Sequence, residues 1–375
     1  MKHIALKYDF DSLLEGLETE VRKGYINRND KKELTLYNYK ECCHYDKAWN
    51  DFSIAARGLI LHIPSGKIVA LPFPKFFNYG EMSREIPELP FSIAEKLDGS
   101  LGVLYFWGEE WHVNTRGSFD SLQGKWAKRW ISKNINTNEL NTNHTYLVEI
   151  IIKENRIVIN YDYEGLVLLS AFKLTNGEEL DKKELDKIAI SSGLKRPDFF
   201  DYTFNELLDV VKTLKANQEG FVLKFSNGLY LKIKGEEYCR VHRSISDITP
   251  LGVWRALMKL DDLEKIRKKL PEEYRVDFNN LVKIINDNIN LYLEEIKKDY
   301  EKTKDLTDKE LGLRLKEFSG ISGKFLFDMR KIDFLNRVKV QGGIRDKFFR
   351  IFRPTGNILD GYVPTGALNR FNDEG

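Results

Sequence analysis

Cysteine and long apolar runs are scarce in this chain of 375 residues. Its three cysteines, Cys42, Cys43 and Cys239, are too few and too irregularly spaced for a disulfide framework or a zinc site. No apolar run approaches the ~18 residues of a membrane-spanning helix. The opening residues already include acids and lack the apolar core of a signal peptide. We therefore expect a cytoplasmic protein of a reducing compartment, without a membrane partner.

A large net charge is absent as well. The 59 Lys and Arg residues nearly balance the 57 Asp and Glu residues, which leaves a net charge of +2. This balance excludes a disordered polyanion or polycation, so any basic surface must come from local clustering. Because 42% of the residues are hydrophobic, the chain can bury sizeable cores, and its length favours two domains.

The first two thirds of the chain alternate short β-branched or aromatic runs with turn residues. Hairpin turns are predicted at Gly108 and at Asn227-Gly228. Tandem hairpins indicate antiparallel sheets rather than parallel βαβ units. The pattern also predicts a strand in the run 156–161 and helices over 118–134 and 180–192. These elements together are typical of an α+β domain.

The pattern becomes helical after about residue 246. Apolar residues from Phe278 to Leu293 recur near a helical period, and Thr307 with Glu310 forms a capping-box pattern. We expect the tail after Pro354 to be irregular. The prediction is an α+β domain over residues 1–245 and an all-helical domain over residues 246–375.

Basic residues cluster near the end of the predicted helical domain. The stretch from Lys324 to Arg353 contains nine basic residues and three acids. Such a local excess fits contacts to RNA phosphates, but it also fits a solvated helix face, because phenylalanines in the same stretch can pack on the other side. The pattern leaves both interpretations open.

The segment Glu95-Lys96-Leu97-Asp98-Gly99-Ser100, which precedes a predicted strand, is the most informative part of the sequence. A lysine can be a nucleophile when burial or neighbouring cations lower its pKa, because only the neutral amine attacks. The glycine would let the backbone approach a phosphate. Taken alone, Lys-x-Asp-Gly is a weak signal that also describes an ordinary turn.

Further charged residues stand in unusual contexts. Glu149 and Glu219 lie within or beside strongly apolar strands, where a surface acid is the structural alternative. Lys232 and Lys234 fall on one face of a predicted strand, where they would repel each other unless an anion lies between them. A solvated edge strand is the alternative for this pair.

These segments, in this order, resemble the covalent nucleotidyltransferase superfamily of ATP-dependent ligases and RNA capping enzymes. In that superfamily Lys-x-Asp-Gly is motif I, the mid-strand acids are motifs III and IV, and Lys-x-Lys is motif V. The resemblance is strongest to the phage-type RNA ligase 1 family and covers roughly residues 35–243. The segments that carry it are Leu36-Tyr37-Asn38-Tyr39, Arg57-Gly58, Lys75-Phe76-Phe77-Asn78, Glu149 with Asn155-Arg156-Ile157-Val158, and Lys232-Ile233-Lys234.

The resemblance implies a nucleotidyltransferase domain of ATP-grasp-like antiparallel sheets with helices, followed by a helical domain for RNA recognition. It implies an ATP-dependent RNA ligase that joins 5′-phosphate and 3′-hydroxyl ends through lysyl-AMP and adenylated RNA. RNA repair or tRNA processing in a bacterial or phage-infected cytosol is the expected setting. RNA, including tRNA, is the expected partner, and we expect a monomer.

The resemblance also implies the cofactors and the roles of individual residues. ATP and Mg²⁺, with Mn²⁺ as a substitute, are the expected cofactors. Lys96 is the expected nucleophile, and the expected metal ligands are Asp98, Glu149 and Glu219. The residues expected to bind ATP and its phosphates are Tyr37, Arg57, Lys75, Glu95, Arg116, Val222, Lys232 and Lys234. The cations among them would also favour the neutral form of Lys96.

One residue departs from the family pattern, and other functions compete. Arg116 stands where the family typically carries a lysine; it keeps the charge and adds bidentate geometry. A DNA ligase or GTP-using capping enzyme is the first alternative, but those enzymes usually append a domain of short strands where this chain turns helical. A non-catalytic RNA-binding protein on a ligase scaffold is the alternative from another class.

A final pattern concerns two tryptophans. Trp126 and Trp130 lie one helical turn apart, among Lys125, Lys128, Arg129 and Lys133. A basic helix with tryptophans can stack on RNA and hold it. Tryptophans in the core with lysines in water are the commoner meaning of such a pattern, and the sequence leaves the question open.

Overall fold

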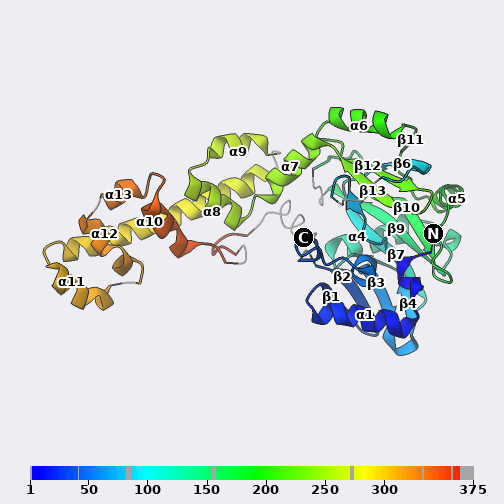
Figure 1. Cartoon of the computed structure of the whole chain (residues 1–375), viewed down its shortest axis with the longest axis horizontal. Coiled ribbons are helices and arrows are strands. Elements are labelled where there is room, and N and C mark those ends of the chain that lie inside the picture. Colours follow the sequence, from blue (N-terminus) through cyan, green and yellow to red (C-terminus); the bar gives the residue numbers. More distant parts are fainter. Residues whose placement is uncertain are drawn as a thin grey trace. The chain divides into compact units, whose positions relative to one another are not determined.

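The computed structural model describes residues 2–40, 42–81, 86–153, 158–270, 274–318, 320–331, 333–355 and 358–363. The described chain divides into two compact units, the first ending at Cys239 and the second beginning at Arg240. The division falls within helix α7 (Glu236–Ser246). Figure 1 shows strands with flanking helices in the first unit and helices in the second. No helix in the described ranges has both the length and the low charge that a membrane crossing needs.

The strands of the first unit form three sheets, with the orders β1-β2-β3-β4, β10-β9-β7-β8 and β11-β6-β12-β13-β5. Neighbouring strands are antiparallel except for the short parallel pair β13 and β5. The strands are β1 (Ile26–Lys31), β2 (Leu34–Tyr39), β3 (Arg57–His62), β4 (Lys67–Ala70), β5 (Phe77–Asn78), β6 (Phe91–Lys96), β7 (Ser100–Trp107), β8 (Glu110–Thr115), β9 (His144–Ile151), β10 (Gly165–Lys173), β11 (Phe199–Phe200), β12 (Gly220–Phe225) and β13 (Tyr230–Lys234).

Helices cover the sheets of this unit and are fixed by local sequence signals. They are α1 (Phe10–Arg22), α2 (Cys42–Tyr45), α3 (Asp51–Ala55), α4 (Leu122–Asn134), α5 (Lys182–Ser192) and α6 (Phe204–Thr213). Asp181 caps the start of α5 in a capping box with Glu184, and Gly193 ends the helix in a left-handed conformation. Hydrophobic cores form where α4 and α5 meet the second sheet and where α6 meets the third.

Several sequence expectations about this unit are confirmed. The α+β class and the mainly antiparallel pairing are observed. Asn227-Gly228 turns between β12 and β13, and Gly108 turns between β7 and β8. Helices occur in the two stretches predicted to contain them, as α4 and α5.

The strand expected in the run 156–161 is not observed. Its described part, from Val158, is irregular, and residues 154–157 lie outside the described residues. Strand β9 pairs with β7 on one edge and with β10 on the other, so it leaves no free edge for this run. The expectation failed because periodicity does not show whether a neighbouring sheet edge is available.

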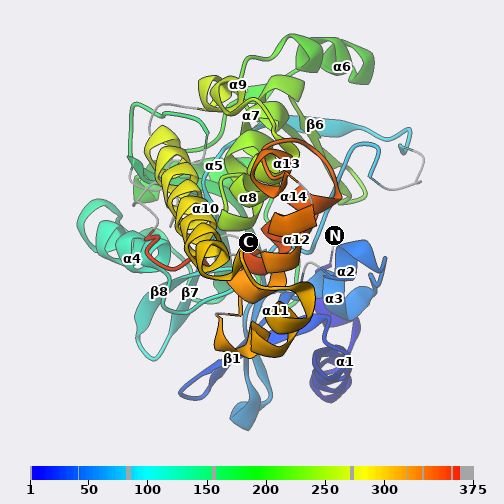
Figure 2. The same cartoon turned by 90° about the vertical axis from the view of Figure 1, so that its left-hand side faces the viewer.

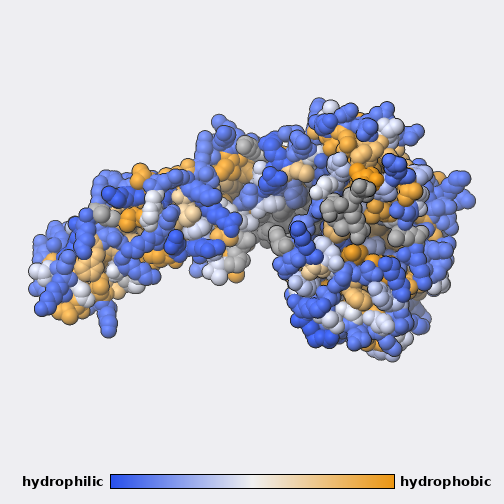
Figure 3. All heavy atoms as spheres, in the orientation of Figure 1, coloured by the Kyte–Doolittle hydropathy of each residue, from blue (hydrophilic) through white to orange (hydrophobic). Residues whose placement is uncertain are grey.

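The regular elements of the second unit in its described residues are helices. Its helices are α8 (Pro250–Lys259), α9 (Leu263–Lys269), α10 (Arg275–Thr303), α11 (Asp308–Arg314), α12 (Leu326–Lys331), α13 (Phe334–Arg337) and α14 (Gly343–Phe349). The predicted capping box of Thr307 and Glu310 opens α11. The tail after Pro354 is irregular in its described part, and residues 364–375 lie outside it. In the face drawn in Figure 3, hydrophilic side chains predominate on both units.

Candidate active site

The register of three adjacent strands brings the predicted lysines together. Lys96 of β6 lies opposite Gly220 of β12, which lies opposite Lys234 of β13. Two residues along, Val222 lies opposite Lys232. Because residues directly opposite each other share a face of a sheet, the nucleophile candidate and the Lys-x-Lys pair project from the same face of the third sheet.

Glu219 joins two of these lysines. Its Oε2 lies 2.8 Å from Lys96 Nζ and its Oε1 lies 2.8 Å from Lys234 Nζ. The carboxylate is only 3% exposed. Burial raises the pKa of Glu219, but Lys96 and Lys234 more than offset this effect and hold the pKa below its ordinary value. Glu219 is therefore ionised and neutralises part of the charge of both lysines.

The charge state of Lys96 differs from the sequence expectation. Burial lowers the pKa of Lys96, but Glu219, Glu149 and Asp98 outweigh it, and the pKa lies above its ordinary value. The expectation that nearby cations favour the neutral amine is therefore wrong for the protein without nucleotide. The reason is distance: an ionised carboxylate touches the amine, whereas most of the cations lie further along the sheet face.

A cluster of four cations, Arg57, Lys75, Arg116 and Lys232, lies against aromatic rings beside this face. We call it the cation cluster. The Lys232 Nζ and the Arg57 guanidinium carbon lie 5.1 Å and 5.0 Å from the centre of the Phe76 ring. Contacts of this kind hold cations in place without neutralising their charge.

The other two members of the cation cluster contact other rings. Lys75 Nζ lies 4.6 Å from the Phe77 ring centre. The Arg116 guanidinium lies over Tyr39, and its Nη1 donates to the Tyr39 hydroxyl at 3.2 Å. These aromatic supports were not predicted as site residues, although the sequence flanks Lys75 with two phenylalanines.

Acidic partners are few around the cation cluster. Burial, together with Arg57, Lys75, Lys96 and Lys234, lowers the pKa of Lys232 to about 6. Arg57 Nε and Nη1 are buried and have no hydrogen-bond partner among the described residues. A buried donor without an acceptor is costly, so this arrangement fits an anion that the protein itself does not supply.

Asp98 has a different position from the one expected of a metal ligand. Its Oδ2 accepts from the backbone N–H groups of Val158 and Ile159, each at 2.8 Å, and its Oδ1 accepts from the Tyr238 hydroxyl at 2.7 Å. Its own N–H donates to the Tyr161 hydroxyl at 2.8 Å. Both carboxylate oxygens therefore bind protein donors, and Asp98 ties the loop after Lys96 to three other parts of the first unit.

Glu149 lies at the middle of β9 and is 8% exposed. Its Oε1 accepts from the Gly99 N–H at 3.1 Å. A Cβ on Gly99 would lie 2.6 Å from the Ile150 carbonyl oxygen. This glycine is thus required by its close approach to β9, which is a different reason from the predicted approach to a phosphate.

The three predicted metal ligands do not form a metal cage. Within the described ranges, no group of three or more His, Cys, Asp or Glu side chains is placed to hold a metal ion. Glu149 and Glu219 are buried carboxylates close enough to Lys96 to raise its pKa, and their hard oxygens suit a cation that also binds phosphate oxygens. Asp98 does not fit, because its oxygens are already bound.

Two other predicted residues lie outside this arrangement. Tyr37 is fully buried in the core of the first sheet, and its hydroxyl donates to Glu18 of α1 at 2.6 Å. Glu95 lies opposite Phe221 and therefore on the sheet face away from Lys96. Burial and Asp198 raise the pKa of Glu95. Tyr39, two residues after Tyr37, is the tyrosine beside Arg116.

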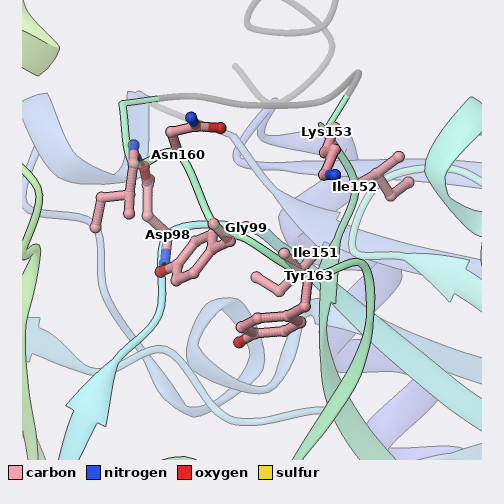
Figure 4. Close-up of a pocket in the computed structure, with 9 residues that line it drawn as sticks. Asp98, Gly99, Ile151, Ile152, Lys153, Asn160 and Tyr163 are labelled. Carbon is pink, nitrogen blue, oxygen red and sulfur yellow. Dashed lines mark hydrogen bonds between the residues drawn. The ribbon is translucent and has the colours of Figure 1, made fainter.

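A small recess adjoins the loop after Lys96. Figure 4 shows Asp98 and Gly99 on one side of it and Ile151 and Tyr163 on another. It does not include the cation cluster. The recess belongs to the hydrogen-bonded support of the loop, and the cation cluster is the better candidate for phosphate binding.

Part of this chain is similar to known proteins. Residues 55–239 match the model of a family described as RNA ligase. An RNA ligase of Rhodothermus phage RM378 is 25% identical over 347 aligned residues, which cover 70% of this chain and 78% of that protein. A protein of Thermovibrio ammonificans, provisionally named an RNA ligase, is 30% identical over 50% of this chain and 52% of that protein.

Among solved structures, an archaeal ATP-dependent RNA ligase superposes on 75% of this chain and 83% of its own with a TM-score of 0.49 and 15% identity. The segment matched by the family model contains Lys96, Glu149, Glu219 and the whole cation cluster. Tyr37 and Tyr39 precede it.

Proposed function

We propose that this chain, of which residues 55–239 match the model of a family described as RNA ligase, is an ATP-dependent RNA ligase that uses Lys96 as its nucleophile. The observation that carries this proposal is a lysine paired with Glu219 beside four cations that lean on aromatic rings. A nucleotide triphosphate has the charge and the length to neutralise such a group. The proposed reaction has three displacements at phosphorus.

In the first displacement, Lys96 Nζ attacks the α-phosphorus of ATP. An N–P bond forms, the bond to the bridging oxygen breaks, and pyrophosphate leaves with that electron pair. In the second, an oxygen of the RNA 5′-phosphate attacks the phosphorus of lysyl-AMP and Lys96 leaves. In the third, an RNA 3′-hydroxyl attacks the activated 5′-phosphate, its proton passes to solvent, and AMP leaves. Such displacements depend mainly on positioning and charge neutralisation.

The proposed role of the cation cluster is to hold the phosphates in line with Lys96. Arg57 brings two buried nitrogens with no hydrogen-bond partner among the described residues, and a guanidinium can donate to two phosphate oxygens at once. Lys232 would gain a proton on meeting an anion, since its pKa is about 6 only because it is buried among other cations. Val222, opposite Lys232 on the same face, is the proposed apolar support for the adenine.

The proposed role of Glu149 and Glu219 is to hold Mg²⁺, for which Mn²⁺ can substitute, next to the phosphates. These two carboxylates raise the pKa of Lys96, so a divalent cation bound to them would compete for their charge and favour the neutral amine. Asp98 is instead a positioning residue that keeps the loop after Lys96 in place. It does so through Val158, Ile159 and Tyr238.

For residues 246–375 we propose recognition of the RNA substrate, including tRNA, in RNA repair. Support comes from the exposed basic residues of the second unit that contact no acid in its described part, among them Arg337 and Lys339. Charge reversal of these two should weaken RNA binding and leave formation of lysyl-AMP intact. Equal loss of both activities would contradict a role limited to RNA.

Transfer of label from α-labelled ATP to the protein, followed by denaturing electrophoresis, tests the proposed function. The wild-type protein should form a labelled adduct, and Lys96→Ala should not. Lys96→Ala should still seal RNA that is already adenylated, because the third displacement does not need the amine. Lys187→Ala, an exposed lysine of α5, is the control. An adduct in Lys96→Ala would place the nucleophile elsewhere, and an adduct from GTP alone would favour the capping alternative.

A further inference from the structure

Helix α4 carries an exposed row of cations beside a row of apolar side chains, of which Trp126 and Trp130 pack partly against the core. Ala127 and Ile131 face the core and are fully buried. On the outer side, Lys125, Arg129 and Lys133 recur every four residues and are all exposed. A second row, Leu122, Trp126 and Trp130, recurs with the same spacing, and residues four apart are neighbours on a helix surface. The helix thus carries a cationic row beside an aromatic row.

The charge of this helix is one-sided. Its thirteen residues include four cations and no acid. Lys128 Nζ pairs with Glu110 at 2.9 Å, and Lys125 Nζ lies 3.8 Å from Asp120. Arg129 and Lys133 contact no acidic side chain in the part of the chain that the structure describes. A polyanion is therefore the complementary partner of this face.

The two tryptophans pack partly against the core and also remain partly exposed. Trp126 and Trp130 are only half-buried, their ring centres lie 6.2 Å apart, and their planes differ by 17°. Trp130 packs against Gly165, where a Cβ would come within 3.0 Å of the indole ring. Core packing accounts for the fixed position of Trp130. It does not account for a partly exposed indole stack beside a row of cations, with Leu122 67% exposed at its end.

The helix also follows the candidate active site closely in sequence. Arg116, a member of the cation cluster, precedes the first residue of α4 by a short loop that Ser121 caps. The helix packs along β8 at the edge of the first unit (Figure 2). With a length of ~20 Å, its outer face can follow several nucleotides that leave the site.

We propose that the outer face of α4 is a docking surface for single-stranded RNA, with phosphates along the cationic row and an unpaired base extending the indole stack. This inference rests on the proposed RNA-joining function and specifies where the RNA lies on the first unit. Aromatic stacking with a cationic track is the usual way in which proteins bind unpaired nucleotides.

The test uses the full chain and a short RNA with a 5′-hydroxyl and a 3′-phosphate, which cannot be joined. Its affinity is measured by fluorescence anisotropy over a series of salt concentrations. The double variant Arg129→Glu, Lys133→Glu should bind about tenfold more weakly, and its plot of log K against log salt should be less steep by about 1.4. Its melting temperature should match the wild type, because both side chains are exposed.

The double variant Lys183→Glu, Lys187→Glu is the control, since it makes the same charge change on exposed positions of α5. It should bind RNA within about twofold of the wild type. If the α4 variant has the affinity and salt slope of this control, the inference is overturned. A second variant, Trp126→Phe, keeps the apolar packing and should reduce the quenching of tryptophan emission by RNA; unchanged quenching would overturn the stacking part.

Lysyl-AMP formation separates this inference from the function on which it rests. All variants should form the adduct at the wild-type rate. Failure of the wild type to form it would overturn the proposed function. If the adduct forms normally but the α4 variants bind RNA as the wild type does, the docking inference is overturned and the proposed function is not.

Discussion

The cation cluster of the first unit and the buried Arg345 of the second differ in the hydrogen-bond partners that the protein gives them. In the cation cluster, Arg57 keeps two buried nitrogens without a hydrogen-bond partner among the described residues, and Lys232 lies among other cations. In the second unit, Arg345 is 7% exposed and donates to the carbonyl oxygens of Leu257, Met258 and Val338. The first arrangement leaves donors that an anion from outside can use, whereas Arg345 already donates to three protein carbonyl oxygens.

The same contrast applies to the basic stretch from Lys324 to Arg353. Besides Arg345, Arg330 binds Asp308 and the Thr303 carbonyl oxygen, and Lys347 pairs with Asp328 at 2.7 Å. Part of the positive charge in this stretch is therefore structural. A count of charges in the sequence overstates the surface that is left for RNA, and only the partners of each cation show how much remains.

The largest effect should come from removing Lys232, a member of the cation cluster. Lys232→Met should lower the rate of lysyl-AMP formation by about a hundredfold or more, because it removes a preorganised amine that becomes a cation once the phosphates bind. The melting temperature should stay the same or rise, since folding holds the pKa of the buried Lys232 amine at about 6 and so works against its protonation. Adduct formation in rapid-quench experiments and thermal unfolding are the two measurements.

Lys224→Met is the matched control for this substitution. Lys224 lies on the same sheet face but pairs with buried Glu179 at 2.9 Å. Its removal should lower the melting temperature, because Glu179 is left with less compensation, while adduct formation persists. If Lys224→Met abolishes the adduct and Lys232→Met does not, the contrast between paired and unpaired cations fails.

Removal of Arg345, whose guanidinium donates to protein carbonyl oxygens, should affect stability instead. Arg345→Met leaves two buried carbonyl oxygens and one part-buried carbonyl oxygen without their donor, which should cost about 3 kcal/mol of unfolding free energy. Chemical denaturation of the full chain measures this loss. Lysyl-AMP formation should remain at the wild-type level. A variant of normal stability that cannot form the adduct would show that Arg345 serves the reaction.

A smaller effect concerns the uptake of a proton by Lys232 when ATP binds. The groups that face Lys232 are Arg57, Lys75, Lys96, Lys234 and Glu81. Because its pKa is about 6 in the folded protein, the amine is mostly neutral at pH 7.5, and a bound triphosphate should restore its proton. Calorimetry in buffers of different ionisation enthalpy should show proton uptake on ATP binding, and Lys232→Met should lack it. Equal uptake in both proteins would assign the proton to another group.

The lowered pKa of Lys232 also predicts how the stability of the nucleotide-free protein changes with pH. Between pH 6 and the ~10.4 of an unfolded lysine, the unfolded chain binds the proton and the folded chain does not. Stability of the nucleotide-free protein should therefore rise with pH in this window. Thermal unfolding measures this: the wild type should gain stability relative to Lys232→Met as the pH rises over this range. A wild type that keeps a constant difference from the variant, or loses stability relative to it, would contradict the assignment.

The smallest effect is expected at Tyr37. Tyr37→Phe removes only the hydrogen bond to Glu18 and should cost about 1 kcal/mol of stability, with normal adduct formation. Tyr39→Phe, which loses the contact to Arg116, should instead slow the adduct. These two variants differ in one hydroxyl at positions two residues apart. Loss of the adduct in Tyr37→Phe alone would return that residue to the site.

The sequence alone determined the α+β class, the position of the hairpin turns and the resemblance carried by Lys96, Glu149, Glu219 and the two lysines of β13. These depend on local signals: turn residues, alternation along strands, and short motifs whose spacing is fixed along the chain. Side-chain alternation even predicts that Lys232 and Lys234 share a face. What the motifs do not contain is the partner of each charge.

Only the tertiary structure decided which charges are compensated. It separated Tyr37 from Tyr39, tied Asp98 to Tyr238, and paired Lys96 with Glu219 so that its pKa rises. It also left the cation cluster with few acids. The physical reason is that each of these outcomes depends on the register between strands and on segments far apart in sequence. Electrostatic effects depend on those distances and on burial, and a linear pattern specifies neither.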